Sequence, residues 1–315
     1  MFPVIWIASF IRMKNIFYFF LIFQFSAVLS AQKVPARPAI TGISHIGLVT
    51  QGLDADRKFY THMLGWTAAP SIEVPNGLRF YGVPRQWVEV APATSPTEQP
   101  FNHVAFTTPD VKGMRLYLAA HGVAVPTAIT RWKDGSKSFR VKDPEGNVVE
   151  FLQPGAMRGH TTPNPQAISS RIIHAGFMVR SAPVEDSFYK QLLGFRLYWT
   201  GGMKDGVTSF VSLQVPNGTD WIEYMLNLPP HPSHRQLGVA DHFSLGVVNM
   251  DTVVAKLSQR GWTPSPGSHK QMGRDGKYQL NLYDPDQVRI EYMEFRPAQK
   301  PCCAPFTGPH PQPDK

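Results

Sequence analysis

The chain has 315 residues, of which 43% are apolar and 17% charged, a composition typical of a globular protein and not of a disordered one. Its net charge of +8 comes from basic residues scattered along the chain, which argues against a nucleic-acid-binding patch. Only two cysteines are present, so a disulfide framework and an all-cysteine zinc site are excluded.

The first recognisable pattern along the chain is an amino-terminal export signal. Residues 16–23 form a short apolar run that follows two basic residues and precedes small residues ending at Ala31. We therefore predict that residues 1–31 are a signal peptide and that the mature protein is secreted or periplasmic, without stable membrane insertion. Retention as a membrane anchor is the alternative, but the run is short for a bilayer, which needs about 20 residues. Met13 resembles a natural signal start, which leaves open whether residues 1–12 are translated.

Residues 41–154 contain a strand–helix–three-strand pattern that occurs twice. Each half begins with a short apolar strand that bears a histidine, first His45 and then His103. A helical pattern follows each strand and ends at a glycine, Gly65 or Gly122, where a helix C-cap belongs. Three short strands follow each helix, so the segment reads as two βαβββ modules.

The same pattern returns after a polar linker at 155–170. His174 follows His45 by 129 residues, and the residues around the two histidines match. His242 follows His103 by 139 residues, so the second unit, at 171–296, carries about ten extra residues between its two modules.

The chain ends in a Pro-rich segment, residues 297–315, which we predict to be disordered. Both cysteines lie in it, as the adjacent pair Cys302 and Cys303. A bridge between neighbours is a strained geometry, so free thiols or an intermolecular link are expected instead.

These repeats predict an α+β fold of four βαβββ modules, paired into two cup-shaped sheet domains. In each module, a histidine on the first strand and a glutamate on the last strand stand at repeated positions. Because side chains alternate along a strand, such a glutamate points away from its apolar neighbours toward the inner face of the sheet. A buried carboxylate is costly alone, and a bound metal offsets that cost.

Eight residues form the predicted metal-ligand set, four in each unit. They are His45, Glu89, His103 and Glu150 in the first unit, and His174, Glu223, His242 and Glu291 in the second. Two imidazoles and two carboxylates suit a divalent transition metal such as Fe, Mn, Ni, Co or Zn, with positions left open for substrate or water.

The chain resembles the vicinal oxygen chelate superfamily, which includes glyoxalase I, extradiol dioxygenases and bleomycin-resistance proteins. The resemblance lies in SHIGL at 44–48, NHVAF at 102–106 and DPEGNVVE at 143–150, and in the matching stretches of the second unit. It covers about residues 41–296, nearly all of the predicted mature chain. It implies paired βαβββ modules, and a His, Glu, His, Glu ligand set as in glyoxalase-like members.

The resemblance leaves the reaction open. Extradiol-type members use two histidines and one glutamate of the second domain, and His174, His242 and Glu291 match those positions. Such enzymes usually carry a tyrosine about ten residues before the glutamate, where this chain has Asn281. Tyr283 is the nearest tyrosine.

We therefore predict an exported, metal-dependent enzyme that acts on a small substrate with vicinal oxygens, as a lyase, isomerase or ring-cleaving dioxygenase. Glu150 or Glu291 would move a proton as the catalytic residue. The alternative is a protein without catalysis that sequesters a small molecule, as bleomycin-resistance proteins do. The small molecule is the only partner that the sequence implies, and a homo-oligomer is left open.

Overall fold

The computed structural model describes residues 35–155 and 164–314, and all of these fall in one compact unit. The predicted signal peptide at 1–31 lies outside the described residues. Within the described part of the chain, no helix is both long and apolar enough to cross a membrane.

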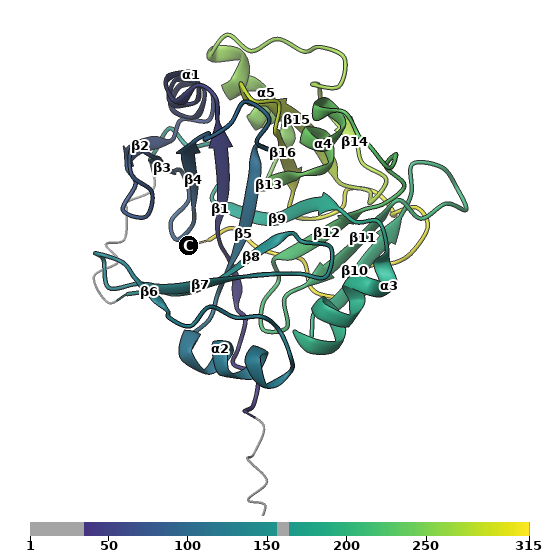
Figure 1. Ribbon diagram of the computed structural model, residues 1–315. Helices are drawn as coiled ribbons and strands as arrows, with labels where there is room; N and C mark the ends of the chain where they lie inside the picture. The colour runs from purple at the N-terminus through teal and green to yellow at the C-terminus, as the bar shows by residue number, and fades with distance from the viewer. Residues whose placement is uncertain (1–34, 156–163, 315) are drawn as a thin grey trace, which may run out of the picture. The chain divides into compact units, whose positions relative to one another are not determined.

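Two eight-stranded sheets make up the fold, one for each predicted unit (Figure 1). The first consists of β1 (Gly42–Thr50), β2 (Thr67–Pro70), β3 (Leu78–Tyr81), β4 (Trp87–Pro92), β5 (Phe101–Thr107), β6 (Thr130–Arg131), β7 (Lys137–Lys142) and β8 (Val148–Gln153). The second consists of β9 (Arg171–Met178), β10 (Arg196–Gly201), β11 (Phe210–Gln214), β12 (Trp221–Met225), β13 (His242–Val247), β14 (Gln271–Met272), β15 (Tyr278–Tyr283) and β16 (Arg289–Glu294).

Both sheets have the same strand order, which confirms the predicted pairing of modules. The first runs β2-β3-β4-β1-β5-β8-β7-β6, and the second runs β10-β11-β12-β9-β13-β16-β15-β14. Within each module the first strand pairs in parallel with the last, as β1 does with β4. The two modules of a sheet then join through their first strands, which run antiparallel: β1 with β5, and β9 with β13. The histidine-bearing strands are therefore neighbours at the centre of each sheet.

The helices are α1 (Leu53–Lys58), α2 (Val111–Ala120), α3 (Ala182–Asp186), α4 (His234–Ala240) and α5 (Met250–Gln259), with π-helical turns η1 (Phe59–Met63) after α1 and η2 (Ser187–Leu192) after α3. The predicted glycine caps are correct: Gly65 and Gly122 have φ of 74° and 81°, in the left-handed region that suits glycine. At the other end of α2, the Asp110 side chain accepts a hydrogen bond from the Gly113 N–H.

Helix α4 lies between β12 and β13, where the second unit gains about half of its ten extra residues: Trp221 follows Trp87 by 134 residues, and His242 follows His103 by 139. Ser233 begins it with a capping box, in which its hydroxyl accepts from the Gln236 N–H and the Gln236 side chain accepts from the Ser233 N–H. The helix ends at Ala240, two residues before His242. Three prolines, at 229, 230 and 232, precede this cap, so composition alone would favour an irregular connector here.

The two sheets contact each other through buried tyrosines and carboxylates. Tyr60, from η1, donates a hydrogen bond to Asp284 Oδ2 at 3.2 Å, and Tyr189, from η2, donates to Asp143 Oδ2 at 3.0 Å. The Gln86 side chain adds a further link, since it bonds both to Ile43 O and to Ile172 O. Each aspartate belongs to the turn before the last strand of the opposite sheet, so these contacts repeat the internal symmetry of the chain.

The Pro-rich tail differs from the disordered segment that its composition predicts, because residues 297–314 pack on the second sheet. The Thr307 N–H donates to Tyr198 O at 2.9 Å, and the Phe306 ring joins an apolar cluster with Tyr198 and Trp199. Prolines cannot form a regular ladder, but the few apolar side chains between them provide enough contact to fix the segment.

The prediction for the cysteines is also wrong in this structure, because Cys302 and Cys303 form a disulfide with each other. Cys303 has φ of 71°, so the turn uses the left-handed region that the prediction had not considered. Cys302 packs against the apolar cluster beneath the tail. The disulfide thus lies where the chain turns toward the second sheet.

Candidate metal centres

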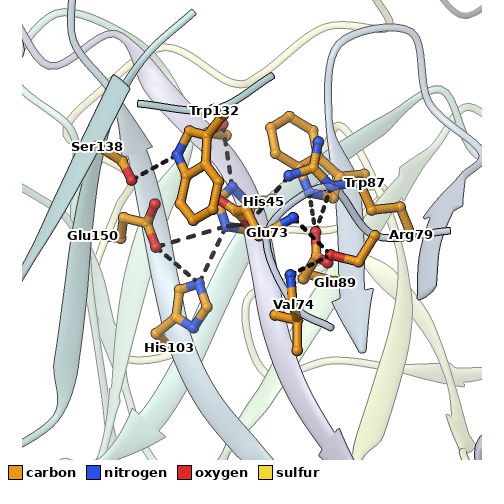
Figure 2. Close-up of polar contacts among 12 residues, drawn as sticks. His45, Glu73, Val74, Arg79, Trp87, Glu89, His103, Trp132, Ser138 and Glu150 are labelled. Carbon is orange, nitrogen blue, oxygen red and sulfur yellow. Dashed lines mark hydrogen bonds and ion pairs between the residues drawn. The ribbon is translucent and has the colours of Figure 1, made fainter. Parts of the chain in front are cut away.

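The first candidate centre lies on the inner face of the first sheet, where His45, His103 and Glu150 converge from β1, β5 and β8. The Nε2 atoms of the two histidines are 3.1 Å apart. Glu150 Oε2 lies 3.3 Å from His103 Nε2 and 4.0 Å from His45 Nε2. Figure 2 shows the three side chains pointing toward a common position. All three are buried.

The second sheet repeats this arrangement with His174, His242 and Glu291. The two Nε2 atoms are 3.0 Å apart, and Glu291 Oε2 lies 3.4 Å from His174 Nε2. The Trp221 indole stacks on the His174 ring, with 4.7 Å between ring centroids. The two centres are therefore closely similar in their donor atoms.

A glycine makes room for one histidine in each centre. A Cβ atom on Gly47 would lie 1.9 Å from His103 Cε1, and one on Gly176 would lie 2.0 Å from His242 Cε1. No real side chain tolerates such contacts. The glycines in SHIGL and IHAGF thus serve to let an imidazole of the neighbouring strand lie directly over the backbone.

Hydrogen bonds fix the tautomer of the second histidine in each centre. His103 Nδ1 lies 2.8 Å from Asn102 Oδ1, and His242 Nδ1 lies 2.7 Å from Ala240 O, the last residue of α4. Both partners are acceptors, so Nδ1 carries the proton and Nε2 presents its lone pair to the centre. Burial holds the pKa of His242 and that of His103 well below the ordinary histidine range, so both rings are neutral.

These donor sets fit a divalent metal. Two ligand atoms that bind one metal at right angles, with bonds of about 2.1 Å, lie about 3 Å apart. The Nε2 pairs have that spacing, and in each centre a carboxylate oxygen lies within reach. His174 Nδ1 is buried without a hydrogen-bond partner, so its single proton is free to sit on Nε2 between the two rings. A metal would replace that proton.

An arginine reaches each centre from a different strand. Arg140, on β7, donates to Glu150 Oε2 at 2.6 Å and approaches His103 Nε2 at 3.3 Å. Arg289, on β16, donates to His242 Nε2 at 2.8 Å. A guanidinium has only donors, so these contacts show that the histidine lone pairs point inward and attract positive charge.

The other two predicted ligands, Glu223 and Glu89, are not members of the triads. Glu223 stands at the edge of the second centre, with Oε2 3.8 Å from His242 Nε2, and burial, then the Glu291 carboxylate, raises its pKa to about 8. Glu89 is held by Arg79, whose Nε lies 2.5 Å from Glu89 Oε2. The structure thus brings six of the eight residues into two triads, places Glu223 beside one, and pairs Glu89 with an arginine.

Glu73 is a site residue that the sequence did not reveal. Its side chain is buried in the loop between β2 and β3, with Oε2 3.8 Å from His45 Nε2 and 3.2 Å from Arg79 Nη2 (Figure 2). Burial, then the carboxylates of Glu150 and Glu89, raises its pKa to about 8. Glu73 lies in no repeat and on no strand, so only the folded loop brings it to the centre.

Replacing Glu73 by Gln is expected to weaken metal binding at the first centre by about tenfold, because it removes a carboxylate next to His45 that a dication would attract. Titration with Co²⁺ in a His242→Ala background isolates the first centre. Glu98→Gln, in an exposed loop where Glu98 bonds to Thr94, is the matched control. Equal affinity in both variants would remove Glu73 from the site.

The strand paired with β16, β15, places an asparagine and not a tyrosine opposite Glu291. Asn281 lies directly opposite Glu291, and its Oδ1 is buried without a hydrogen-bond partner. Tyr283 lies opposite Arg289 on the same face of β15 as Asn281, and its ring lies 5.4 Å from the guanidinium of Arg235 on α4. The residue of β15 directly opposite Glu291 is therefore an amide.

Comparison with known proteins places both sheets in one family. The model of the Glyoxalase/Bleomycin resistance protein/Dioxygenase superfamily matches residues 42–151 and again 171–292. No curated protein matches the sequence.

Solved structures share the tandem fold. Homoprotocatechuate 2,3-dioxygenase from Brevibacterium fuscum, in complex with 3,4-dihydroxyphenylacetate, has a TM-score of 0.63 and 19% identity, over 88% of this chain and 85% of its own. The 2,3-dioxygenase LapB from Pseudomonas sp. KL28 has a TM-score of 0.63 and 14% identity, over 89% and 96%. At these identities the likeness concerns the fold.

Proposed function

The chain belongs to the Glyoxalase/Bleomycin resistance protein/Dioxygenase superfamily, and on this basis we propose that it is a metal-dependent enzyme acting on a small substrate with vicinal oxygens. The observation that carries the proposal is the convergence of His174, His242 and Glu291, with Nε2 atoms 3.0 Å apart and a carboxylate oxygen 3.4 Å from one of them. A divalent metal held there would supply Lewis acidity and leave positions open for two substrate oxygens.

We place the reaction in the second sheet, with a small aromatic substrate as its best match. Trp221 stacks on His174, and the Tyr198 ring lies 5.1 Å from the Trp221 ring, so a flat ring finds aromatic walls beside the triad. Arg289 keeps a positive charge next to His242, where it can stabilise an oxyanion of the substrate. Two histidines and one glutamate are the ligand pattern of Fe(II) enzymes that use O₂, so ring-cleaving dioxygenation is the preferred reaction.

A lyase or isomerase is the second candidate, and Glu223 favours it. This carboxyl group lies 3.8 Å from His242 Nε2 and accepts a hydrogen bond from Ser212. Glu223 is thus placed as a fourth donor beside the triad, as glyoxalase-like chemistry requires, whereas the amide of Asn281 offers no proton for ring opening.

An anaerobic binding experiment followed by addition of O₂ tests these candidates. The full-length protein is loaded with Fe²⁺ and mixed with catechol, and the change in its absorption spectrum reports binding. Oxygen uptake with ring-opened product supports the dioxygenase, whereas binding without uptake favours the lyase or isomerase. A protein that takes up no Fe²⁺, Mn²⁺, Co²⁺, Ni²⁺ or Zn²⁺ at all would instead be a sequestering protein, and the proposal would fail.

We also propose that the protein is exported through the segment at 1–31. The disulfide between Cys302 and Cys303 supports this, because such bonds persist in oxidising compartments. Amino-terminal sequencing of the protein from its native host is expected to begin near Ala31 or Gln32. A chain that begins at Met1 or Met13 in the membrane fraction would indicate an anchor instead.

A further inference from the structure

Lys277 is a buried cation that the proposed reaction does not use. It lies just before β15, none of its side chain is exposed, and its backbone N–H donates to Asp275 Oδ1 at 3.1 Å. Its Nζ approaches Tyr198 Oη at 3.4 Å and Met293 Sδ at 3.8 Å. Met293 and Glu291 lie on the same face of β16, so the lysine side chain shares the inner face of the second sheet with the triad.

The ammonium group is surrounded by rings. It lies 4.7 Å from the Trp221 ring, 5.2 Å from the Phe306 ring and 5.4 Å from the Tyr198 ring. Among the described residues, no carboxylate forms an ion pair with it within 4.0 Å. Asp275, Glu291 and Glu223 act on it electrostatically from farther away. Burying an ammonium without a carboxylate in direct contact is costly, and cation–π contacts offset only part of that cost. The buried Lys277 ammonium next to a candidate metal centre points to a ligand that supplies the contacting anion.

Lys277 and the triad share neighbours on the inner face of the second sheet. The Trp221 indole contacts both, since it stacks on His174 and also faces the lysine Nζ. Met293, which touches Nζ, follows Glu291 by two residues, or about 7 Å along a strand. A ligand whose vicinal oxygens lie at the triad would therefore hold a substituent on the far side of its ring close to the ammonium.

The first sheet also has a cation over the matching tryptophan, since the Arg79 guanidinium lies 4.6 Å from the Trp87 ring. There, however, Glu89 and Glu73 pair with the cation directly, so the fold does not impose an ammonium without a contacting carboxylate. Arg140 faces Glu150 in the first sheet as Asn281 faces Glu291 in the second. Counting back four residues from each places Ser136 where the second sheet has Lys277. The stacked tryptophan is present in both, since the His45 and Trp87 ring centroids are 4.5 Å apart. A lysine at this position, without a carboxylate in contact, is thus one feature that distinguishes the second centre from the first.

The tail covers this position. The Phe306 ring lies 4.8 Å from the Tyr198 ring, and His310 Nδ1 lies 2.6 Å from Tyr198 Oη. The Gln214 side chain, on β11, donates to Pro309 O at 2.8 Å. The tail thus places an aromatic ring of its own against the ammonium, and a ligand that reaches Lys277 must displace it.

We propose that Lys277 recognises an acidic substituent, such as a carboxylate, on an aromatic ligand whose vicinal oxygens lie at His174, His242 and Glu291, and that Phe306 gives way to that ligand. This inference rests on the proposed function and specifies its substrate class. The neutral rings hold the aromatic part of the ligand, and the ammonium gains a carboxylate in direct contact, which Asp275, Glu291 and Glu223 do not provide.

The test compares two catechols that differ in one carboxylate, 3,4-dihydroxyphenylacetate and 4-methylcatechol. Binding to the Fe²⁺-loaded, full-length protein is measured without O₂. The wild type is expected to bind the acid at least tenfold more tightly than the neutral catechol. Lys277→Met should abolish this preference and leave the affinity for 4-methylcatechol within about threefold of wild type. Lys270→Met, which removes an outer lysine paired with Asp251, should keep the preference.

Three results separate the possible failures. If the metal-loaded wild type binds neither catechol, the proposed function fails. If it binds both equally, or if Lys277→Met keeps the preference, the assignment of Lys277 fails and the proposed function stands. Phe306→Ala is expected to strengthen binding of both catechols, and unchanged affinity would show that the tail does not compete. Metal content and thermal unfolding of each variant confirm that it has folded with its centre intact.

Discussion

Replacing His242 by alanine is expected to lower the Fe²⁺ affinity of the second centre by more than about 100-fold. Mutating a residue that only hydrogen-bonds to a metal ligand typically lowers metal affinity by about 10–100-fold, and loss of the ligand itself should cost more. The imidazole supplies one of only two nitrogen donors, and its Nε2 lies 3.0 Å from that of His174. Turnover and catechol binding should be lost together with the metal. Titration with Fe²⁺ under anaerobic conditions measures the affinity, and oxygen uptake measures the turnover.

The matched control is His62→Ala. His62 is also a histidine, but it lies on η1 at the surface and bonds to Arg260 O. We expect wild-type metal affinity and turnover in this variant. If His242→Ala retained the affinity and activity of wild type, the second centre would not hold the metal.

Raising the pH from 5 to 8.5 is expected to destabilise the folded protein by at least about 3 kcal/mol through the carboxyl groups where the two sheets meet, since Asp56 alone loses about 1.4 kcal/mol for each pH unit between 5 and its pKa of about 7. Asp56, on α1, and Asp284, which accepts from Tyr60, are both buried. Burial, with a smaller contribution from Asp286, raises the pKa of Asp56 to about 7. Burial and then the Asp56 carboxylate raise the pKa of Asp284 to about 8.

The direction of the effect follows from these pKa values. Both lie above the value of about 3.9 for an unfolded aspartate, so the folded state favours the protonated form. The stabilisation is complete below about pH 4 and is lost as the pH rises through 7 to 8. For a chain of this size the loss corresponds to a fall of about 6–12 °C in Tm.

Asp56→Asn tests this prediction, because the amide keeps the size of the side chain and cannot ionise. Thermal unfolding from pH 5 to 8.5 should show a shallower decline in the variant than in wild type. Glu185, which stands 129 residues after Asp56 and has its pKa raised to about 8 by burial and then by Asp143, offers a second variant, Glu185→Gln. If Tm fell by the same amount in wild type and in both variants, these carboxyl groups would not be the cause of the pH-dependent loss of stability.

The sequence predicted those parts of the fold that depend on repeated local patterns. His45 and His174 occur in matching strands, and Gly65 and Gly122 end helices in the left-handed region, so the four modules could be recognised without a structure. The pairing of these modules into two sheets was predicted from the same repeat. The six triad residues lie on strands whose alternation fixes the direction of their side chains.

Features that depend on contacts distant in sequence escaped prediction. Glu73 reaches His45 from a loop with no pattern, and Glu89 meets Arg79 on the adjacent strand. Lys277 becomes buried only because strands from three parts of the chain and the tail surround it. The tail itself looks disordered by composition, yet Phe306 fixes it on the second sheet. Arg79 and Glu89 are only ten residues apart, but their pairing depends on the register of β3 and β4; in the other cases the deciding partner is too distant in sequence for local patterns to reveal it.

The most direct test of the two metal centres is the metal content of four proteins after loading and gel filtration: wild type, His103→Ala, His242→Ala and the double variant. Elemental analysis is expected to find two divalent ions per chain in wild type, one in each single variant and none in the double variant. Far-ultraviolet circular dichroism checks that all four are folded. Equal metal content in all four proteins, or none in folded wild type, would contradict the conclusion that the paired histidines hold a metal.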